Sequence, residues 1–151
     1  METKFIVDVM LGRLSKWLRV MDYDTYYQMS FEEETIRRSI EEGRIFLSRR
    51  AQIAKRVPGA IWVRSNHVGE QLRELAQKGI LRPHRSKWFR RCIVCNVPLR
   101  KAAGEISMEG VPDYVLQHKI SDISWCPACH RLFWAGTHRE KMTRQLKEWG
   151  F

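Results

Sequence analysis

The four cysteines of the chain fall into two pairs that are suited to hold a metal ion. Two residues separate the members of each pair: Cys92 and Cys95, then Cys126 and Cys129. This spacing lets both thiolates of a pair face one ion from a tight turn, and two such turns supply a tetrahedral site. The pattern therefore predicts a zinc ribbon over about residues 90–135.

The expected zinc is structural, because four thiolates leave no open position for water. Its binding would stabilise a segment too short to bury much core, as in zinc-finger peptides, where binding contributes about 10–16 kcal/mol. Two disulfides are the competing interpretation, but they need an oxidising compartment, to which nothing in the sequence points. His130 and His138 are weaker candidates as substitute ligands.

The chain is strongly basic, with a net charge of +10 over 151 residues. Two long stretches, residues 43–69 and 75–104, contain no acidic residue. Such cationic fields favour polyanions through phosphate contacts and counterion release. A solvated basic surface without a ligand is the plainer alternative.

Length and hydropathy limit the classes of protein to consider. The chain can form one ordinary domain, or a small domain with a metal-stabilised appendage. Its apolar runs are too short to span a membrane, and its first residues lack a signal-peptide pattern. We therefore expect a cytoplasmic protein with no membrane partner.

The first half alternates short apolar runs with amphipathic stretches. Strands are predicted near residues 5–8, 24–28, 44–48 and 60–63, and helices near residues 11–21, 30–43, 51–57 and 67–78. Ser30 and Glu33 form a capping-box signature for the second helix. The alternation predicts an α/β domain over residues 1–81, in which helices flank a parallel sheet.

The candidate catalytic residues lie where these strands are expected to end. Ligands of parallel sheets gather at the carboxyl ends of the strands. The first strand ends at Asp8, and Glu32 stands at the start of the second helix. A metal-dependent nuclease needs three or four carboxylates around Mg²⁺ or Mn²⁺, and these two residues could supply part of that set. A helix cap for Asp8 and favourable dipole placement for Glu32 are the structural alternatives.

The segment between the two expected modules is a candidate binding surface for nucleic acid. Residues 82–91 read as a basic linker, residues 92–136 as the ribbon, and residues 137–151 as a C-terminal helix capped by Thr137 and Glu140. In the linker, arginine and lysine could hold phosphates while an aromatic ring stacks on unpaired bases. These linker candidates are Arg82, Arg85, Lys87, Trp88, Arg90 and Arg91. Packing of the ribbon against the sheet is the structural alternative for Trp88.

A series of motifs, in order along nearly the whole chain, resembles the Mut-seven C-terminal (Mut7-C) domain family. They are FIVDVMLGRL at residues 5–14, WLR at 17–19, YDT at 23–25, EGRI at 42–45, EQL at 70–72, CIVCN at 92–96, the cysteine pair at 126–129 and FWAGTH at 133–138. The resemblance implies a PIN-like α/β fold with a zinc ribbon, and ribonuclease activity. Arg13 on the first helix, and Arg49 and Arg50 at the end of the third strand, are further candidates for phosphate contact.

One position departs from the family pattern. The resemblance implies Thr-Arg-Asp after the third strand, where this chain has Ser48-Arg49-Arg50. Two like charges about 4 Å apart repel by about 4 kcal/mol near a protein surface, and arginine cannot lose its proton to relieve this. We expect Arg50 to hold a phosphate or to pair with Asp8, with weak or absent metal binding there.

Three functions are compatible with these features. The leading one is an RNA-binding module, with a preference for single strands and a degenerate PIN-like catalytic site. The alternatives are a metal-dependent ribonuclease using Mg²⁺ or Mn²⁺ and, after it, a protein-interaction adaptor. RNA is the expected partner and a nuclease is a candidate second partner, while the oligomeric state is left open.

Overall fold

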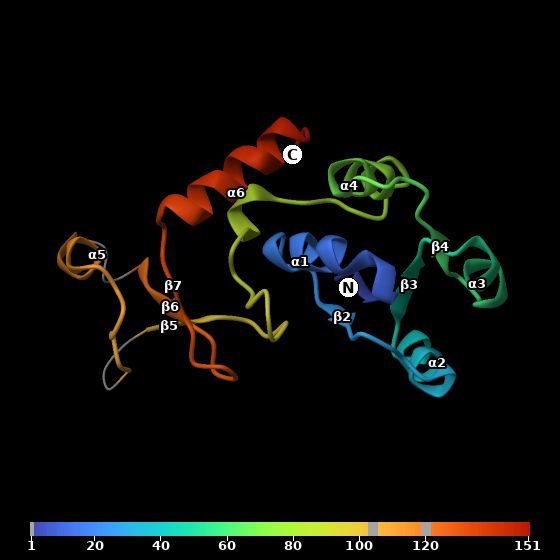
Figure 1. Cartoon of the computed structure of the whole chain (residues 1–151), viewed down its shortest axis with the longest axis horizontal. Helices are drawn as coiled ribbons and strands as arrows, with labels where there is room; N and C mark the ends of the chain where they lie inside the picture. Colours follow the sequence, from blue (N-terminus) through green and yellow to red (C-terminus); the bar gives the residue numbers. More distant parts are fainter. Residues whose placement is uncertain (1, 103–105, 119–121) are drawn as a thin grey trace. The chain divides into compact units, whose positions relative to one another are not determined.

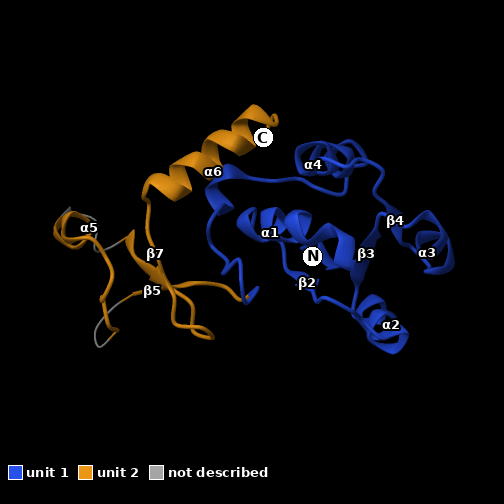
Figure 2. Ribbon diagram, viewed as in Figure 1, with its two compact units in different colours: residues 1–96 blue, residues 97–151 orange. Residues whose placement is uncertain are grey.

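A computed structural model describes residues 2–102, 106–118 and 122–151 of the chain (Figure 1). The chain divides into two compact units, residues 1–96 and residues 97–151 (Figure 2). The first cysteine pair therefore belongs to the same unit as the N-terminal residues. The expected boundaries at residues 81 and 91 stay predictions.

The first unit is built on a four-stranded sheet in which all neighbouring strands are parallel, as predicted. The strand order is β2-β1-β3-β4. The strands are β1 (Lys4–Val7), β2 (Thr25–Tyr27), β3 (Arg44–Ser48) and β4 (Ile61–Trp62). Their short apolar, β-branched and aromatic runs suit buried parallel strands.

Helices connect and flank these strands. They are α1 (Gly12–Val20), α2 (Glu33–Glu41), α3 (Ala51–Arg56) and α4 (Val68–Gln77), with the 3₁₀ turns η1 (Val9–Leu11) and η2 (Arg85–Lys87). Helix α1 contacts β2 and α4, whereas α2 and α3 contact β3. Because crossovers between parallel strands are right-handed, the reversal of strand order places α1 on one face and α2 and α3 on the other.

The strand order reverses direction between β1 and β3, which lie side by side in register. From β1 the chain moves outward to β2, then returns to β3 and continues to β4. In open α/β sheets the crevice beside such a switch point, at the carboxyl ends of the strands, is where ligands bind. Here those ends are Val7 and Ser48, so Asp8 and Arg49 are the next residues along the chain.

The core of this unit explains why the elements form. Phe5, Ile6 and Val7 of β1 are fully buried, and Phe46 and Leu47 of β3 are almost so. Leu14 and Leu18, four residues apart on one face of α1, are also fully buried. Removal of this apolar surface from water is the main force that holds the helices on the sheet.

The capping box predicted for the second helix is wrong. Helix α2 begins at Glu33, and Glu32 is its N-cap in an extended conformation, without a side-chain cap bond. The carbonyl oxygen of Glu32 accepts from the amides of Thr35 and Ile36, so the first turn forms two residues after Ser30.

The second unit contains a three-stranded antiparallel sheet, ordered β5-β6-β7. Its elements are β5 (Arg100–Lys101), α5 (Asp113–His118), β6 (Ser124–Trp125), β7 (Leu132–Phe133) and the C-terminal helix α6 (Thr137–Glu148). Val111, Val115 and Ile123 form its small buried cluster. The predicted helix cap is wrong here too, because the N-cap is Gly136 and Thr137 is the first helical residue.

Within the described part of the chain, no helix is long and apolar enough to cross a membrane.

Candidate functional site

Asp8 and Arg50 form a bidentate ion pair at the switch point of the sheet. The Nε and Nη2 atoms of Arg50 donate to the two carboxylate oxygens of Asp8 at 2.8 and 2.7 Å. The Asp8 side chain is 7% exposed, whereas that of Arg50 is 47% exposed. Of the two roles expected for Arg50, pairing with Asp8 is the one seen in the structure.

Ser48 and the backbone complete the hydrogen bonds of this corner. The Ser48 hydroxyl donates to Asp8 Oδ2 at 2.8 Å and accepts from the backbone amide of Arg50 at 3.0 Å. The amide of Val9 donates to Asp8 Oδ1 at 2.9 Å, so Asp8 also caps η1. Each carboxylate oxygen thus accepts two hydrogen bonds, which leaves Asp8 little capacity to bind a metal ion directly.

The pKa of Asp8 lies below its ordinary value of 3.8. Burial alone would raise it, but hydrogen bonds from Arg50, Ser48 and the Val9 amide, with the charge of Arg50, outweigh that effect. Each of these interactions favours the ionised carboxylate. The corner therefore holds a fixed anion that is neutralised by a fixed cation.

The described residues do not assemble the carboxylate cluster of a metal-dependent nuclease. Among the described residues, the one group of three or more histidine, cysteine or acidic side chains that could hold a metal consists of cysteines. Glu32 is exposed at the start of α2 and is not part of any such group. The neighbouring Glu34 pairs with Arg37 and Arg38 on the surface of α2.

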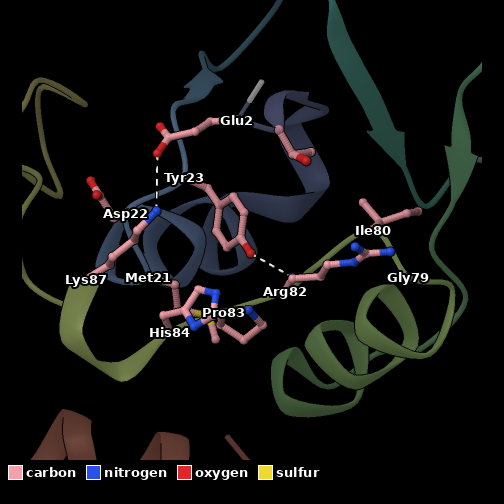
Figure 3. Close-up of a pocket in the computed structure, with 11 residues that line it drawn as sticks. Glu2, Met21, Asp22, Tyr23, Gly79, Ile80, Arg82, Pro83, His84 and Lys87 are labelled. Carbon is pink, nitrogen blue, oxygen red and sulfur yellow. Dashed lines mark hydrogen bonds and ion pairs between the residues drawn. The ribbon is translucent and has the colours of Figure 1, made fainter.

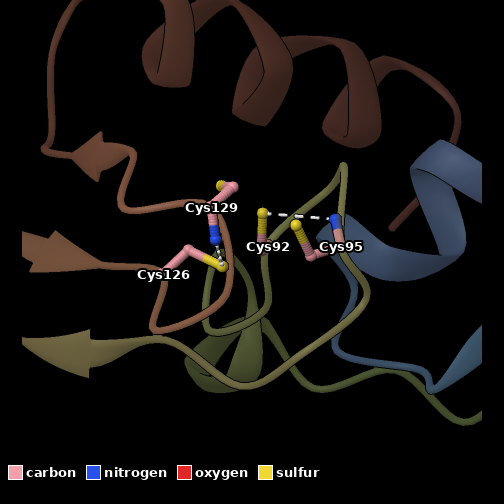
Figure 4. Close-up of side chains that lie close together, drawn as sticks. All are labelled: Cys92, Cys95, Cys126 and Cys129. Atoms are coloured by element: carbon pink, nitrogen blue, oxygen red, sulfur yellow. Dashed lines mark hydrogen bonds between the residues drawn. The ribbon is translucent and has the colours of Figure 1, made fainter.

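The cysteine group contains all four predicted ligands, Cys92, Cys95, Cys126 and Cys129 (Figure 4). Their sulfur atoms all lie within 4.8 Å of one another, and none is part of a disulfide. A set of four thiolates at this separation fits one tetrahedral zinc ion, for which the Zn–S distance is about 2.3 Å. Neither His130 nor His138 belongs to the group, so they are not substitute ligands.

The two cysteine turns have the same backbone design. The amide of Asn96 donates to the Cys92 carbonyl at 2.9 Å, and that of His130 donates to the Cys126 carbonyl at 2.8 Å. Asn96 and His130 have φ values of 64° and 63°, in the left-handed region that closes such a turn. His130 is therefore a turn residue.

Within each turn an amide also points at a sulfur atom. The amide of Cys95 donates to Cys92 Sγ at 3.4 Å, and that of Cys129 donates to Cys126 Sγ at 3.5 Å. These hydrogen bonds favour the thiolate form that binds metal.

Arg19 connects the first cysteine turn to the sheet. Its Nε and Nη2 donate to the carbonyl oxygen of Thr25 in β2, and its Nη1 donates to the carbonyls of Ile93 and Val94 between the two cysteines. Arg19 is 8% exposed. Burial lowers its pKa, while the nearby thiols of Cys92 and Cys95 act in the opposite direction.

The model of the Mut7-C RNAse domain family matches residues 3–146 of the chain. The chain belongs to this family. No curated protein and no solved structure matches it. The match includes the corner at Asp8 and both cysteine turns.

In this member of the Mut7-C family, two of the expected linker contacts are structural. Trp88 is 6% exposed, so its ring has little accessible face for a nucleic-acid base in this structure. Arg91 donates to the Asn96 carbonyl at 2.8 Å and pairs with Asp22 at 3.4 Å, with its side chain 11% exposed. Both side chains are therefore largely buried in the first unit.

Other linker residues line a cavity of about 340 Å³ in the first unit (Figure 3). The Tyr23 hydroxyl accepts from the backbone amide of Arg82 at 2.9 Å, and Lys87 Nζ lies 3.3 Å from Glu2 Oε1. Burial raises the pKa of Tyr23, against a smaller opposite effect of the Arg82 amide. The cavity is thus lined by the ion pair of Lys87 with Glu2 and by the aromatic ring of Tyr23.

The remaining basic candidates lie on the surface of the first unit. Arg13, Arg85 and Arg90 are exposed, and the guanidinium carbon of Arg85 lies 5.9 Å from the centre of the Trp88 ring. Arg49, half-buried after β3, donates to the carbonyl of Arg64 at 3.5 Å. The structure brings Arg49 and Arg50 together at the corner of the sheet.

Proposed function

We propose that this protein is an RNA-binding module that prefers single strands and whose PIN-like catalytic corner is degenerate. The observation that carries the proposal is the ion pair between Asp8 and Arg50. Family membership supports an RNA-related role, and the net charge of +10 supports a polyanionic partner.

The chemistry of phosphodiester hydrolysis explains why this ion pair matters. A divalent metal polarises the phosphate and generates the attacking hydroxide, and converging carboxylates hold that metal. Arg50 already occupies both oxygens of Asp8 with a cation that cannot deprotonate. Arginine is instead a strong ligand for phosphate, which it holds through planar, charge-assisted hydrogen bonds.

The proposed binding surface includes the arginines that are at least partly exposed, rather than the buried ones. Arg49 and Arg50 at the sheet corner, with Arg13 and Arg90, are the candidates for phosphate contact. Duplex RNA is recognised mainly through its shape and backbone, whereas unpaired bases can stack on side chains. The mixture of arginines with exposed aromatic groups supports the preference for single strands.

We also propose that the cysteine group holds one structural zinc ion, for which its geometry supplies a complete ligand set. Mg²⁺ or Mn²⁺ has no role in the leading proposal. A cytoplasmic location fits reduced thiols, which persist in reducing compartments. A separate nuclease acting on the bound RNA is the proposed second partner.

The proposal is tested by incubating labelled single-stranded RNA with the full chain in Mn²⁺ and following both cleavage and gel mobility of the RNA over time. The controls are an EDTA lane and Asp8→Asn protein prepared in parallel. The expected result is a gel shift without cleavage. Affinity should fall with salt, with a slope of about −0.7 for each phosphate contact in log–log form. Arg49→Glu should weaken binding more than Lys78→Glu, an equal charge reversal on an exposed residue at the end of α4.

A metal-dependent ribonuclease is the second candidate, because the matched family is an RNAse domain and Asp8 is retained at the corner. Cleavage that needs metal and disappears in Asp8→Asn would establish it and overturn the leading proposal. RNA affinity that hardly changes with salt, or in Arg49→Glu and Arg90→Glu, would favour a protein-interaction adaptor.

A further inference from the structure

Trp62, at the end of β4, is exposed, and the guanidinium group of Arg64 lies over its ring. The guanidinium carbon of Arg64 lies 4.5 Å from the centre of the Trp62 ring. Trp62 is 38% exposed, whereas most aromatic residues at strand positions in this unit are less accessible. The indole Nε1 donates to the carbonyl of Arg49 at 3.1 Å, which fixes the plane of the ring.

This stack lies beside the corner that contains Arg50. Trp62 is in register with Ser48 of β3, and Arg49 and Arg50 follow Ser48 directly. The Arg50 side chain is 47% exposed, and its Nη1 has no hydrogen bond to any described residue. Arg49 is half-buried: its Nη2 donates to the Arg64 carbonyl, and its Nε is buried without a partner among the described residues. Arg50 therefore keeps the accessible donor, and Arg49 adds its charge beside it.

The charges around the stack favour one orientation of a bound nucleotide. Both carboxylate oxygens of Glu74 accept from the backbone amide of Arg64 at 3.2 Å, which places a negative charge next to Arg64. At the Arg50 end, the charge of Asp8 is neutralised by its ion pair. A phosphate is therefore favoured beside Arg49 and Arg50, and an uncharged base is favoured at Trp62 and Arg64.

We propose that Trp62 and Arg64 form a stacking site for one unpaired nucleobase, whose adjoining phosphate is held by Arg49 and Arg50. The inference rests on the proposed RNA-binding function and adds to it a base-contacting position. Arginine planes and aromatic rings are the usual platforms for unpaired bases. Because every base has a π-face, the site accepts single strands with little sequence preference.

The test uses the full chain and two fluorescently labelled single-stranded RNAs of the same length, one intact and one abasic at several central positions. Wild-type protein is expected to bind the intact strand more tightly than the abasic strand. Trp62→Leu is expected to lose about tenfold in affinity for the intact strand, the order found for one stacked base, and little for the abasic strand. Trp62→Phe keeps a ring and should retain most of the preference.

Tyr114→Leu is the matched control, because Tyr114 is an aromatic residue of the second unit that is 57% exposed. It should bind both strands like wild type. Circular dichroism and the thermal transition establish that each variant is folded. If Trp62→Leu lowers affinity for both strands equally, or for neither, the stacking site is overturned while the RNA-binding proposal stands. If wild type binds neither strand, both are overturned.

A second measurement needs no variant. Single-stranded RNA containing 5-iodouridine is irradiated with the wild-type protein, and the cross-linked peptides are identified by mass spectrometry. Trypsin cleavage after Arg56 and Arg64 gives a peptide of residues 57–64 in which Trp62 is the one aromatic residue. A cross-link on this peptide is expected. Cross-links confined to other peptides would overturn the stacking site.

Discussion

Arg50 holds both carboxylate oxygens of Asp8, at the point where the strand order of the parallel sheet reverses. In a nuclease this position would present acidic oxygens to a divalent cation. In this chain the cation is a side chain, and the Ser48 hydroxyl and the Val9 amide complete the coordination of the carboxylate. The carboxylate that a nuclease would use for metal binding is thus held in an ion pair and hydrogen bonds within the chain.

Arg50→Ala should lower the free energy of unfolding by about 1–2 kcal/mol. Removing one partner of a buried ion pair costs more, but Arg50 is half exposed, so the loss is reduced by solvent screening. Urea unfolding of Arg50→Ala, Asp8→Asn and the double variant measures their coupling. Arg38→Ala, which removes an exposed partner of Glu34, is the control and should have a smaller effect. Strict additivity of the Asp8 and Arg50 variants would contradict the ion pair.

The pH dependence of stability should show the lowered pKa of Asp8. A carboxyl whose pKa is lower in the folded state contributes stability above its unfolded pKa, near 3.8, and loses it as the pH falls through the folded pKa. The difference in unfolding free energy between wild type and Asp8→Asn should therefore shrink below about pH 4. In Arg50→Ala the pKa of Asp8 should be higher, which carboxyl chemical shifts measured by NMR can establish. An unchanged pKa of Asp8 in Arg50→Ala would contradict the conclusion that Arg50 lowers it.

Removal of metal should destabilise the protein. We expect one zinc ion per chain by elemental analysis, and a strong zinc chelator should lower the thermal transition temperature, because four thiolates would lose their shared ion. Cys126→Ser should have the same effect. His130→Asn is the control, since asparagine tolerates the positive φ of this position, and it should keep the zinc. Zinc loss from His130→Asn would contradict the four-cysteine assignment.

Arg19→Lys should weaken both the fold and metal retention. Lysine keeps the charge but lacks the planar fork that reaches the Thr25 carbonyl and the first cysteine turn together. We expect a loss of about 2–3 kcal/mol, measured by urea unfolding, and faster zinc release to a chelator. Arg13→Lys, an exposed position on the same helix, should change neither quantity measurably. Equal rates of zinc release from both variants would mean that Arg19 does not contribute to zinc retention.

The strands and the cysteine group could be predicted because their signals are local. The apolar run of β3 has the bounds predicted for it, 44–48, and the cysteine spacing identified all members of the group. The two helix starts were predicted less well. The capping chemistry of Ser30 and Thr137 is not used, because the N-caps are Glu32 and Gly136 and neither makes a side-chain cap bond.

The burial of charged and aromatic side chains could not be predicted, because their partners lie far away in the sequence. Arg19 reaches Ile93 and Val94 across more than 70 residues. Trp88 looked equally suited to a core and to a surface, and Trp62 had no distinguishing signal. The pairing of Arg50 with Asp8 was one of two expected outcomes, since the departure from the family pattern placed a cation beside the retained aspartate.

The ion pair at the switch point also changes how that corner responds to its surroundings. A bound metal ion exchanges with solution, so its occupancy follows the supply of that ion and can be reversed by a competitor. Arg50 is attached to the chain, and its local concentration at Asp8 is set by the fold. The positive charge beside Asp8 is therefore part of the chain and needs no divalent ion from solution.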